Sequence, residues 1–197
     1  EDGGQLALTK FLVLFDDPGI DQRDFRQVLP YVLARCHFET DLFVLANLAM
    51  DTLDYTGPAV NEGSKGILLG IGDPVRELPH EFRGELPDGA QEVAPYCAGA
   101  LAVTGPAYSQ DAGYAQRLAA DAHVADWPLL FLVDDCRVVQ RNISFLWSTF
   151  TRFEPAADIH AAGSRLHRHH EILEAPIVFD CRMKPGYPDE LVADQDT

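Results

Sequence analysis

The sequence predicts an α/β fold with a mostly parallel sheet flanked by helices, built from two similar β-α-β halves around a Pro/Gly-rich insertion. The main observation is a pair of continuous apolar runs at 10–15 and 129–133, each ending in two aspartates. Such runs are typical of strands buried on both faces. Apolar positions at helical spacing follow each run. Because a strand, a crossover helix and another strand favour parallel pairing, we expect the sheet to be mostly parallel.

The first half begins with a strand at 10–15, which the turn residues at 16–19 end. Asp21 is placed to cap a helix over 24–35, because its side chain can accept hydrogen bonds from the free N–H groups of the first turn. The next short buried strand is expected at 42–45.

The segment 73–113 contains five prolines and several glycines, so we expect a loop-rich insertion with one strand at 98–103. The spacing of apolar residues predicts a helix over 110–122. The second half then contains, in order, a strand, a helix and a late strand: 129–133, 141–150 and 177–179.

An internal repeat relates the two halves, which indicates duplication or mimicry of one unit. The distance from the second aspartate to the arginine is 18 residues in one copy and 17 in the other. Each copy has a strand, two aspartates, a helix, an arginine, five residues and a further aspartate: Asp16-Asp17, Arg35 and Asp41 in the first, Asp134-Asp135, Arg152 and Asp158 in the second.

A length of 197 residues suits one large domain or two small ones, and we treat 1–197 as a single domain with the insertion inside it. The apolar fraction of 47% and the charged fraction of 23% are ordinary for a globular protein. With 15 basic and 31 acidic residues, the net charge of −16 repels phosphate backbones and anionic lipid. We therefore expect neither nucleic acid nor a membrane as a partner.

The cysteines indicate a reducing compartment, because no two form a CxxC pair and each lies beside apolar or mixed residues. No run of 18 apolar residues and no secretory signal pattern is present in the sequence. We expect a cytoplasmic location. The first residue is Glu1 and not a methionine. The sequence given can therefore be a trimmed form, a processed product or a piece of a longer polypeptide. The four cysteines are Cys36, Cys97, Cys136 and Cys181.

The two aspartate pairs are the first candidate site, since carboxylates at the C-terminal ends of strands can bind magnesium. The same residues can cap the following helix. No phosphate-binding loop accompanies either pair, so we favour the cap.

The histidines that cluster late in the chain are the second candidate: His160, His167, His169 and His170. Imidazoles at this density can bind zinc. In a strand, however, only His167 and His169 share a face, and Arg168 would repel a cation. We expect a partly exposed polar segment and no metal site.

Glycine-rich stretches form the third candidate. The run 63–66 (GSKG) could bind an anion through backbone N–H groups and its lysine, and a tight turn explains it equally well. Gly66, Gly70 and Gly72 give a weak GxxxGxG pattern that lacks the required strand and helix order. Lys10, at the mouth of the first strand, is a further possible anion contact.

Several segments together resemble the UbiD-type decarboxylases, the 3-polyprenyl-4-hydroxybenzoate decarboxylase group. The strand LTKFLVLFDD at 8–17 is similar to that family's T-K-F-(apolar)-D-D strand. Further segments are similar to the family's L-D-(x)-P…G-S-K stretch, its F-(x)-W-(x)-T-F-T-R…P…D-I segment and its closing strand: 53–66, 145–160 and 175–185. After Lys65 the family's M-G-(x)-D-A-T is replaced by a glycine- and leucine-rich run, so we expect a different pocket edge.

The resemblance implies an enzyme that uses prenylated FMN, with a divalent metal, to decarboxylate aromatic or α,β-unsaturated acids. It places the catalytic residues and the metal site in an N-terminal half that has no counterpart here. The matching part is the C-terminal assembly domain. Of its residues, Lys10 alone aligns with a cofactor contact, a lysine near the phosphate.

The leading hypothesis is therefore an assembly domain of a UbiD-type carboxy-lyase, inactive by itself. Its expected partners are further copies of the chain and the flavin-binding N-terminal domain of the same enzyme. The alternative is a free-standing assembly or regulatory protein of the same fold. A small metalloenzyme built on the aspartate pairs or the histidines is the third possibility.

Overall fold

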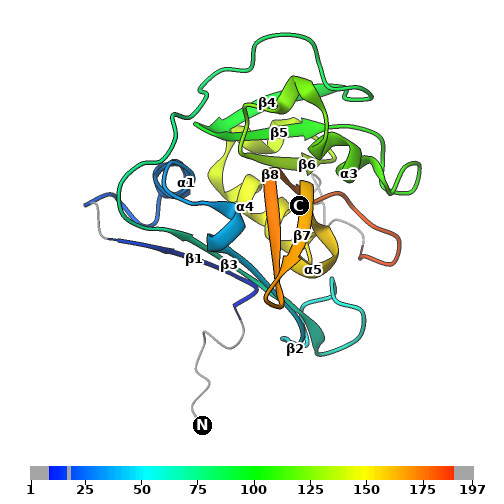
Figure 1. Cartoon of the computed structure of the whole chain (residues 1–197). Helices are drawn as coiled ribbons and strands as arrows, with labels where there is room; N and C mark the ends of the chain where they lie inside the picture. The colour runs from blue at the N-terminus through cyan, green and yellow to red at the C-terminus, as the bar shows by residue number, and fades with distance from the viewer. Residues whose placement is uncertain (1–8, 17–18, 189–197) are drawn as a thin grey trace, which may run out of the picture.

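The computed structural model describes residues 9–16 and 19–188 and divides their strands between two mixed sheets. The first has the order β1-β3-β2, and the second has the order β4-β5-β6-β8-β7. Figure 1 shows them as separate layers, with α1 and α4 between them. None of the helices in the described ranges has the length and apolar character that crossing a membrane requires.

The first sheet contains β1 (Phe11–Phe15), β2 (Leu42–Ala49) and β3 (Glu62–Gly70). β1 runs parallel to β3, whereas β2 runs antiparallel to it. Along the chain, the helices α1 (Phe25–Leu33) and α2 (Phe38–Asp41) connect β1 to β2.

The second sheet has parallel pairs in its centre and an antiparallel pair at each edge. Its strands are β4 (Glu92–Cys97), β5 (Ala100–Thr104), β6 (Leu129–Val133), β7 (Ile159–His167) and β8 (His170–Asp180). The helices of this half are α3 (Tyr114–Ala119), α4 (Asn142–Thr151) and α5 (Pro155–Asp158), with 3-10 turns η2 (Ala122–Val124) and η3 (Cys136–Gln140).

The prediction of one mostly parallel sheet is wrong. Strands β1 and β2 are not neighbours, because β3 lies between them and pairs antiparallel with β2. A helix lies between β1 and β2, but the chain between β2 and β3 contains no helix, and these two strands pair antiparallel. The glycines of β3 concealed this strand in the sequence, since glycine weakens a strand pattern.

Two local predictions are also corrected. Asp24, not Asp21, caps α1 by accepting a hydrogen bond from the backbone N–H of Arg26, while Asp21 accepts one from Arg23. Strands β4 and β5 both lie within 73–113, where we expected one strand.

The internal repeat is present in the topology. Each half has a strand, a helix, a four-residue helix, an outer strand and a last strand inserted between the first two. In each half the last strand is parallel to the first and antiparallel to the second. The registers also correspond: Val13, Leu68 and Leu42 form one cross-strand row, as do Phe131, Phe179 and Ile159.

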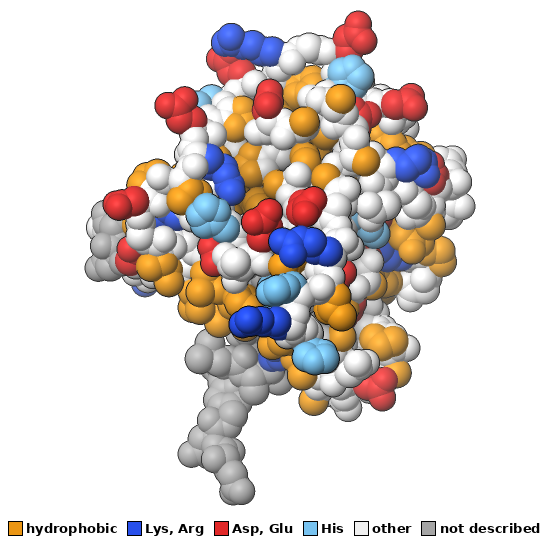
Figure 2. Space-filling model, viewed as in Figure 1, with side chains coloured by type: hydrophobic (Ala, Val, Ile, Leu, Met, Phe, Trp, Pro, Cys, Tyr) orange, Lys and Arg blue, Asp and Glu red, His pale blue; other side chains and the backbone are white. Residues whose placement is uncertain are grey.

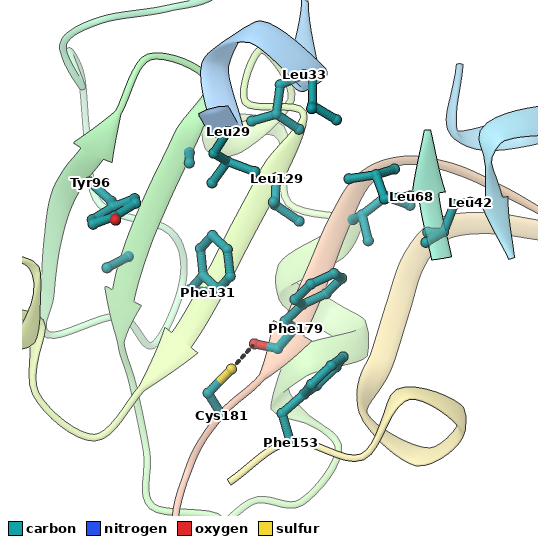
Figure 3. Close-up of a cluster of buried hydrophobic side chains, with 14 of the residues drawn as sticks. Leu29, Leu33, Leu42, Leu68, Tyr96, Leu129, Phe131, Phe153, Phe179 and Cys181 are labelled. Carbon is teal, nitrogen blue, oxygen red and sulfur yellow. Dashed lines mark hydrogen bonds between the residues drawn. The ribbon is translucent and has the colours of Figure 1, made fainter. Parts of the chain in front are cut away.

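The larger core lies between the two sheets and includes buried side chains of both (Figure 3). Phe153 stacks on Phe179, with ring centroids 4.7 Å apart, and Phe11 meets Phe179 edge-on. A second core lies on the far face of the second sheet, beneath α3. The two halves thus share one core, and the second half has another of its own.

Candidate functional site

Lys10 lies at the start of β1 and holds three parts of the chain together. Its ammonium donates hydrogen bonds to Asp54 Oδ1 at 2.9 Å, to Thr56 Oγ1 at 2.9 Å and to the carbonyl of Phe150 at 3.3 Å. A lysine ammonium has three donors, so these contacts use all of them. The Lys10 side chain is only 14% exposed.

Asp54 belongs to the loop between β2 and β3, and the loop is arranged around its carboxylate. Thr56 donates to Asp54 Oδ1 from its backbone N–H at 3.0 Å and from its hydroxyl at 2.6 Å. Burial acts to raise the pKa of Asp54, but the hydrogen bonds from Thr56 and Lys10 outweigh it and lower the pKa below its ordinary value. The carboxylate is therefore held ionised beside the ammonium.

The second half contributes the N-terminus of α5 to the same region. The backbone N–H of Ala156 donates to Ser64 Oγ at 2.8 Å. Glu154 caps α5 by accepting from the N–H of Ala157 at 2.7 Å. Ser64 lies inside β3, so the run 63–66 is a strand that contacts α5 and not the anion-binding turn we considered.

A cavity of about 700 Å³ opens between these elements. One wall is the part of β2 where the register shifts between Leu45 and Leu48. The charged side chains that line the cavity are two carboxylates, Glu62 and Glu154, and Thr56 connects it to the Lys10 contacts. Its other lining comes from the loop before β3, from the start of β3 and from α5: Gly57, Pro58, Asn61, Gly63, Ala156 and Ala157.

The surroundings of Lys10 do not fit a phosphate as they stand. All three ammonium donors already have acceptors in the chain, and one of these is a carboxylate that would repel a phosphate. Lys10 is also not among the residues that line the cavity. The chemistry of this site in the described chain is that of a buried ion pair beside an acidic cavity.

The first aspartate of each pair, Asp16 or Asp134, holds strand ends together. Asp16 accepts from the N–H of Gly72 at 3.1 Å, and this hydrogen bond lowers its pKa. Asp134 accepts from the N–H of Met183 at 2.9 Å and from Arg152 at 3.0 Å. In each half a carboxylate after the first strand thus binds the backbone just beyond the last strand.

The second aspartate of the later pair is a cap, as we favoured. Asp135 accepts from the backbone N–H of Arg137 at 2.8 Å at the start of η3. Asp17 lies outside the described residues.

The histidine cluster is spread over the β7–β8 hairpin. His167 and His170 face each other across the two strands, and His169 follows Arg168 in the turn. His160 lies at the other end of β7, where burial lowers its pKa. Figure 2 shows histidines and basic side chains mixed with acidic ones on this face. Among the described residues, no three His, Cys, Asp or Glu side chains are placed to hold a metal ion.

Two of the three GxxxGxG glycines serve packing, whereas Gly72 lies beyond β3 with a φ of 84° and nothing within 4 Å of its Cβ position. A Cβ on Gly66 would lie 2.3 Å from the ring of Phe11, and a Cβ on Gly70 would lie 2.5 Å from the Cα of Val32. β3 can approach its neighbours this closely because it has glycine at both positions.

Sequence reasoning missed Glu154 and the ion pair between Lys184 and Asp158, although Asp158 was part of the internal repeat. Lys184 lies 3.2 Å from Asp158 and also donates to the carbonyl of Arg152 at 3.0 Å. Asp158 accepts from the N–H of Glu154 at 2.7 Å. A polar residue followed by proline at 154–155 is a typical helix start, and that signal could have identified α5.

The amino-acid sequence is similar to a known protein family and to several known proteins. The model of a family described as the C-terminal domain of 3-octaprenyl-4-hydroxybenzoate carboxy-lyase matches residues 2–70. A Chlamydia pneumoniae protein, named as a subunit of 4-hydroxybenzoate decarboxylase, is 41% identical over 195 residues, which are 98% of this chain and 33% of that protein. An uncharacterized protein of Chlamydia trachomatis is 40% identical with the same coverage. The chain thus spans about a third of the length of these relatives.

Proposed function

Since the chain belongs to the family of UbiD-type carboxy-lyase C-terminal domains, we propose that it is the assembly domain of such a decarboxylase, with the catalytic site carried by another part of the enzyme. The observation that carries this proposal is the convergence of the family-like segments. The segments 8–17, 53–66 and 145–160 are far apart in sequence, yet contacts of Lys10 and Ser64 bring them together beside one cavity.

The reaction proposed for the whole enzyme is the decarboxylation of an aromatic or α,β-unsaturated acid. Prenylated FMN, with its divalent metal, would supply the carbon–carbon bond cleavage and would be held by the flavin-binding half. This chain's part is structural, because its ion pair and its capped helix fix the shape of a surface that the other half can meet. Lys10 as a contact of the cofactor phosphate stays a prediction from the resemblance.

The proposed partners are other copies of this chain and the flavin-binding N-terminal domain of the same enzyme. Support comes from the name of the relative from Chlamydia pneumoniae, which describes that protein as one subunit of a decarboxylase. We propose a cytoplasmic location, in keeping with four cysteines that form no disulfide among themselves.

A replacement experiment tests the proposal. This chain would replace the matching third of the Chlamydia pneumoniae relative, and the hybrid would be assayed for release of carbon dioxide from 4-hydroxybenzoate in the presence of prenylated FMN. We expect turnover by the hybrid, and none by the relative that lacks that third. The isolated chain should neither retain flavin nor release carbon dioxide.

Two results would contradict the proposal. Decarboxylation by the purified chain alone would show that it contains a catalytic site. A folded hybrid that binds flavin and stays inactive would favour the alternative, a free-standing assembly or regulatory protein of the same fold.

A further inference from the structure

The cavity beside α5 contains two carboxylates and no cationic side chain. Among the residues that line its volume of about 700 Å³, the charged ones are Glu62 and Glu154. Neither carboxylate forms an ion pair with a basic side chain in the described part of the chain. The ammonium of Lys10, which Thr56 connects to the cavity, is already paired with Asp54. The cavity is therefore an acidic space whose charge is not balanced by described residues.

The carboxylate of Glu154 is nearly buried, and only one of its oxygens is used. The residue is 7% exposed, and its Oε2 accepts a hydrogen bond from the N–H of Ala157 at 2.7 Å. The other oxygen, Oε1, has no donor among the described residues and is not fully enclosed. Since Glu154 lines the cavity, this oxygen is available to a donor there. A buried charge is costly unless it is paired, so a cationic donor in the cavity would remove this cost.

The internal repeat shows the corresponding place in a closed form. Helix α2 lies against β8 as α5 lies against β3. Glu154 corresponds to His37, since each precedes a four-residue helix and donates its backbone N–H to the last aspartate of that helix at 2.7 Å. Counted from the equivalent rows of β3 and β8, Glu62 corresponds to Leu173, which is 6% exposed and belongs to the larger core. The fold can thus fill this place with apolar packing, and the acidic opening is specific to the first sheet.

We propose that the cavity binds a small organic dication, an aliphatic chain with an ammonium or guanidinium group at each end. One end pairs with Glu154 and the other with Glu62, as charge-assisted hydrogen bonds favour. The aliphatic part of the ligand lies against the apolar lining: Ala46, Leu48, Ala49, Pro58, Ala156 and Ala157.

The size of the cavity and the donor set favour this class over a metal ion. A volume of about 700 Å³ lies in the range of sites for small organic molecules. A bare cation would need several ligands close together, and no three His, Cys, Asp or Glu side chains of the described ranges provide them. The net charge of −16 attracts cations to the chain in general, so the test has to separate this site from the rest of the surface.

Isothermal titration calorimetry with 1,4-diaminobutane and agmatine tests the proposal, in about 0.15 M salt to screen attraction to the surface. We expect one dication bound per chain. Butylammonium, which has one charged end, should bind at least about tenfold more weakly, because one carboxylate stays unpaired. Uncharged 1,4-butanediol and Mg²⁺ should not compete with the dication.

Substitutions in the lining locate the site. Glu62→Gln and Glu154→Gln should each weaken binding at least about tenfold, and the glutamine at 154 retains an oxygen that can cap Ala157. Ala157→Leu narrows the cavity without changing any charge and should abolish binding. The matched control is Glu77→Gln, Glu171→Gln, which removes two exposed carboxylates elsewhere and should leave binding unchanged. Circular dichroism would verify that each variant folds.

Several results would overturn the assignment. These are equal affinity for butylammonium and 1,4-diaminobutane, competition by Mg²⁺, a control variant as weak as Glu154→Gln, or full binding by Ala157→Leu. A basic side chain of the flavin-binding half is the other source of such a cation, and the hybrid enzyme separates the two. The hybrid should bind 1,4-diaminobutane as the chain alone does, whereas a hybrid that excludes it would show that the other half fills the cavity and that no free ligand does. None of these results bears on the decarboxylase role, which the turnover of the hybrid tests.

Discussion

Lys10 shows how one residue can fix the relative positions of distant segments. Its ammonium joins the start of β1 to the loop before β3 and to the end of α4. The pair with Asp54 is nearly buried, at 14% and 13% side-chain exposure. Removing one member of such a pair leaves the other charge buried and unpaired, which destabilises a protein more than loss of a surface ion pair.

Lys10→Met should therefore lower the free energy of unfolding at neutral pH by about 3 kcal/mol. The pKa of Asp54 lies below its unfolded value, so the stability it confers is present above about pH 4 and is lost as pH falls through the folded pKa. In Lys10→Met, the loss of unfolding free energy between neutral and acid pH should be smaller than in the wild type. Urea denaturation at pH 7 and pH 3 measures both effects.

Asp54→Asn provides the control for this prediction. In its background, Lys10→Met should cost less than in the wild type, because the carboxylate is gone. An equal cost in both backgrounds would show that the pair is not the source of the stability. The same Lys10→Met change in the hybrid enzyme separates this structural role from a cofactor contact, since only the latter lowers flavin retention in a folded protein.

Asp158 should make the protein less stable as pH rises. Burial raises its pKa to about 6, although Lys184 opposes the shift. A folded pKa above the unfolded one favours folding at low pH, and this contribution is lost between about pH 4 and pH 6. It amounts to at most about 3 kcal/mol.

The difference in unfolding free energy between wild type and Asp158→Asn isolates this effect. We expect the difference to change between about pH 4 and 6 in the direction that disfavours the wild type, and to be constant above pH 6. A difference that does not change over this range would show that Lys184 keeps the carboxylate ionised throughout.

At the scale of elements, the β7–β8 hairpin presents histidines without the geometry of a zinc site. His167 and His170 pair across the strands, and Arg168 and His169 form the turn with positive φ angles. A closed structural zinc site needs four ligands at tetrahedral positions.

We expect no tightly bound zinc in the purified chain after mild chelation, as measured by elemental analysis. His167→Ala and His169→Ala should leave the metal content unchanged. One retained zinc per chain that disappears in either variant would contradict this prediction.

At the scale of the whole molecule, the order of several elements follows from the sequence. The strands at 10–15 and 129–133 and the helices after them lie close to their predicted positions. The internal repeat was also predictable from the sequence, because the aspartates and the arginine of each half have nearly the same spacing. The pairing of strands was not predictable in this way, since it depends on where β3 and β8 insert, and neither has a local signal for its neighbours.

Tertiary contacts also decide what the candidate residues do. The aromatic side chains at 145–153, in α4 and just after it, have different surroundings. Phe145 and Phe153 are fully buried, whereas Trp147 is exposed. The sequence pattern could not separate them, because the side of α4 that faces the core depends on how both sheets pack against it. The acidic cavity could not be predicted from the sequence either, since its lining comes from four separated segments of the chain.

The shared core has a consequence for where the chain can be divided. The family model ends at residue 70, at the end of β3, so the matched segment coincides with the first half. Yet Leu42 and Leu68 pack in one core with Phe131 and Phe179 of the second half. A fragment that stops at residue 70 would expose to water the face of the first sheet that packs in this core. The unit recognised by sequence is therefore smaller than the unit that folds, and a shortened expression fragment should extend through β8 to Lys184, whose ammonium anchors the chain to Asp158.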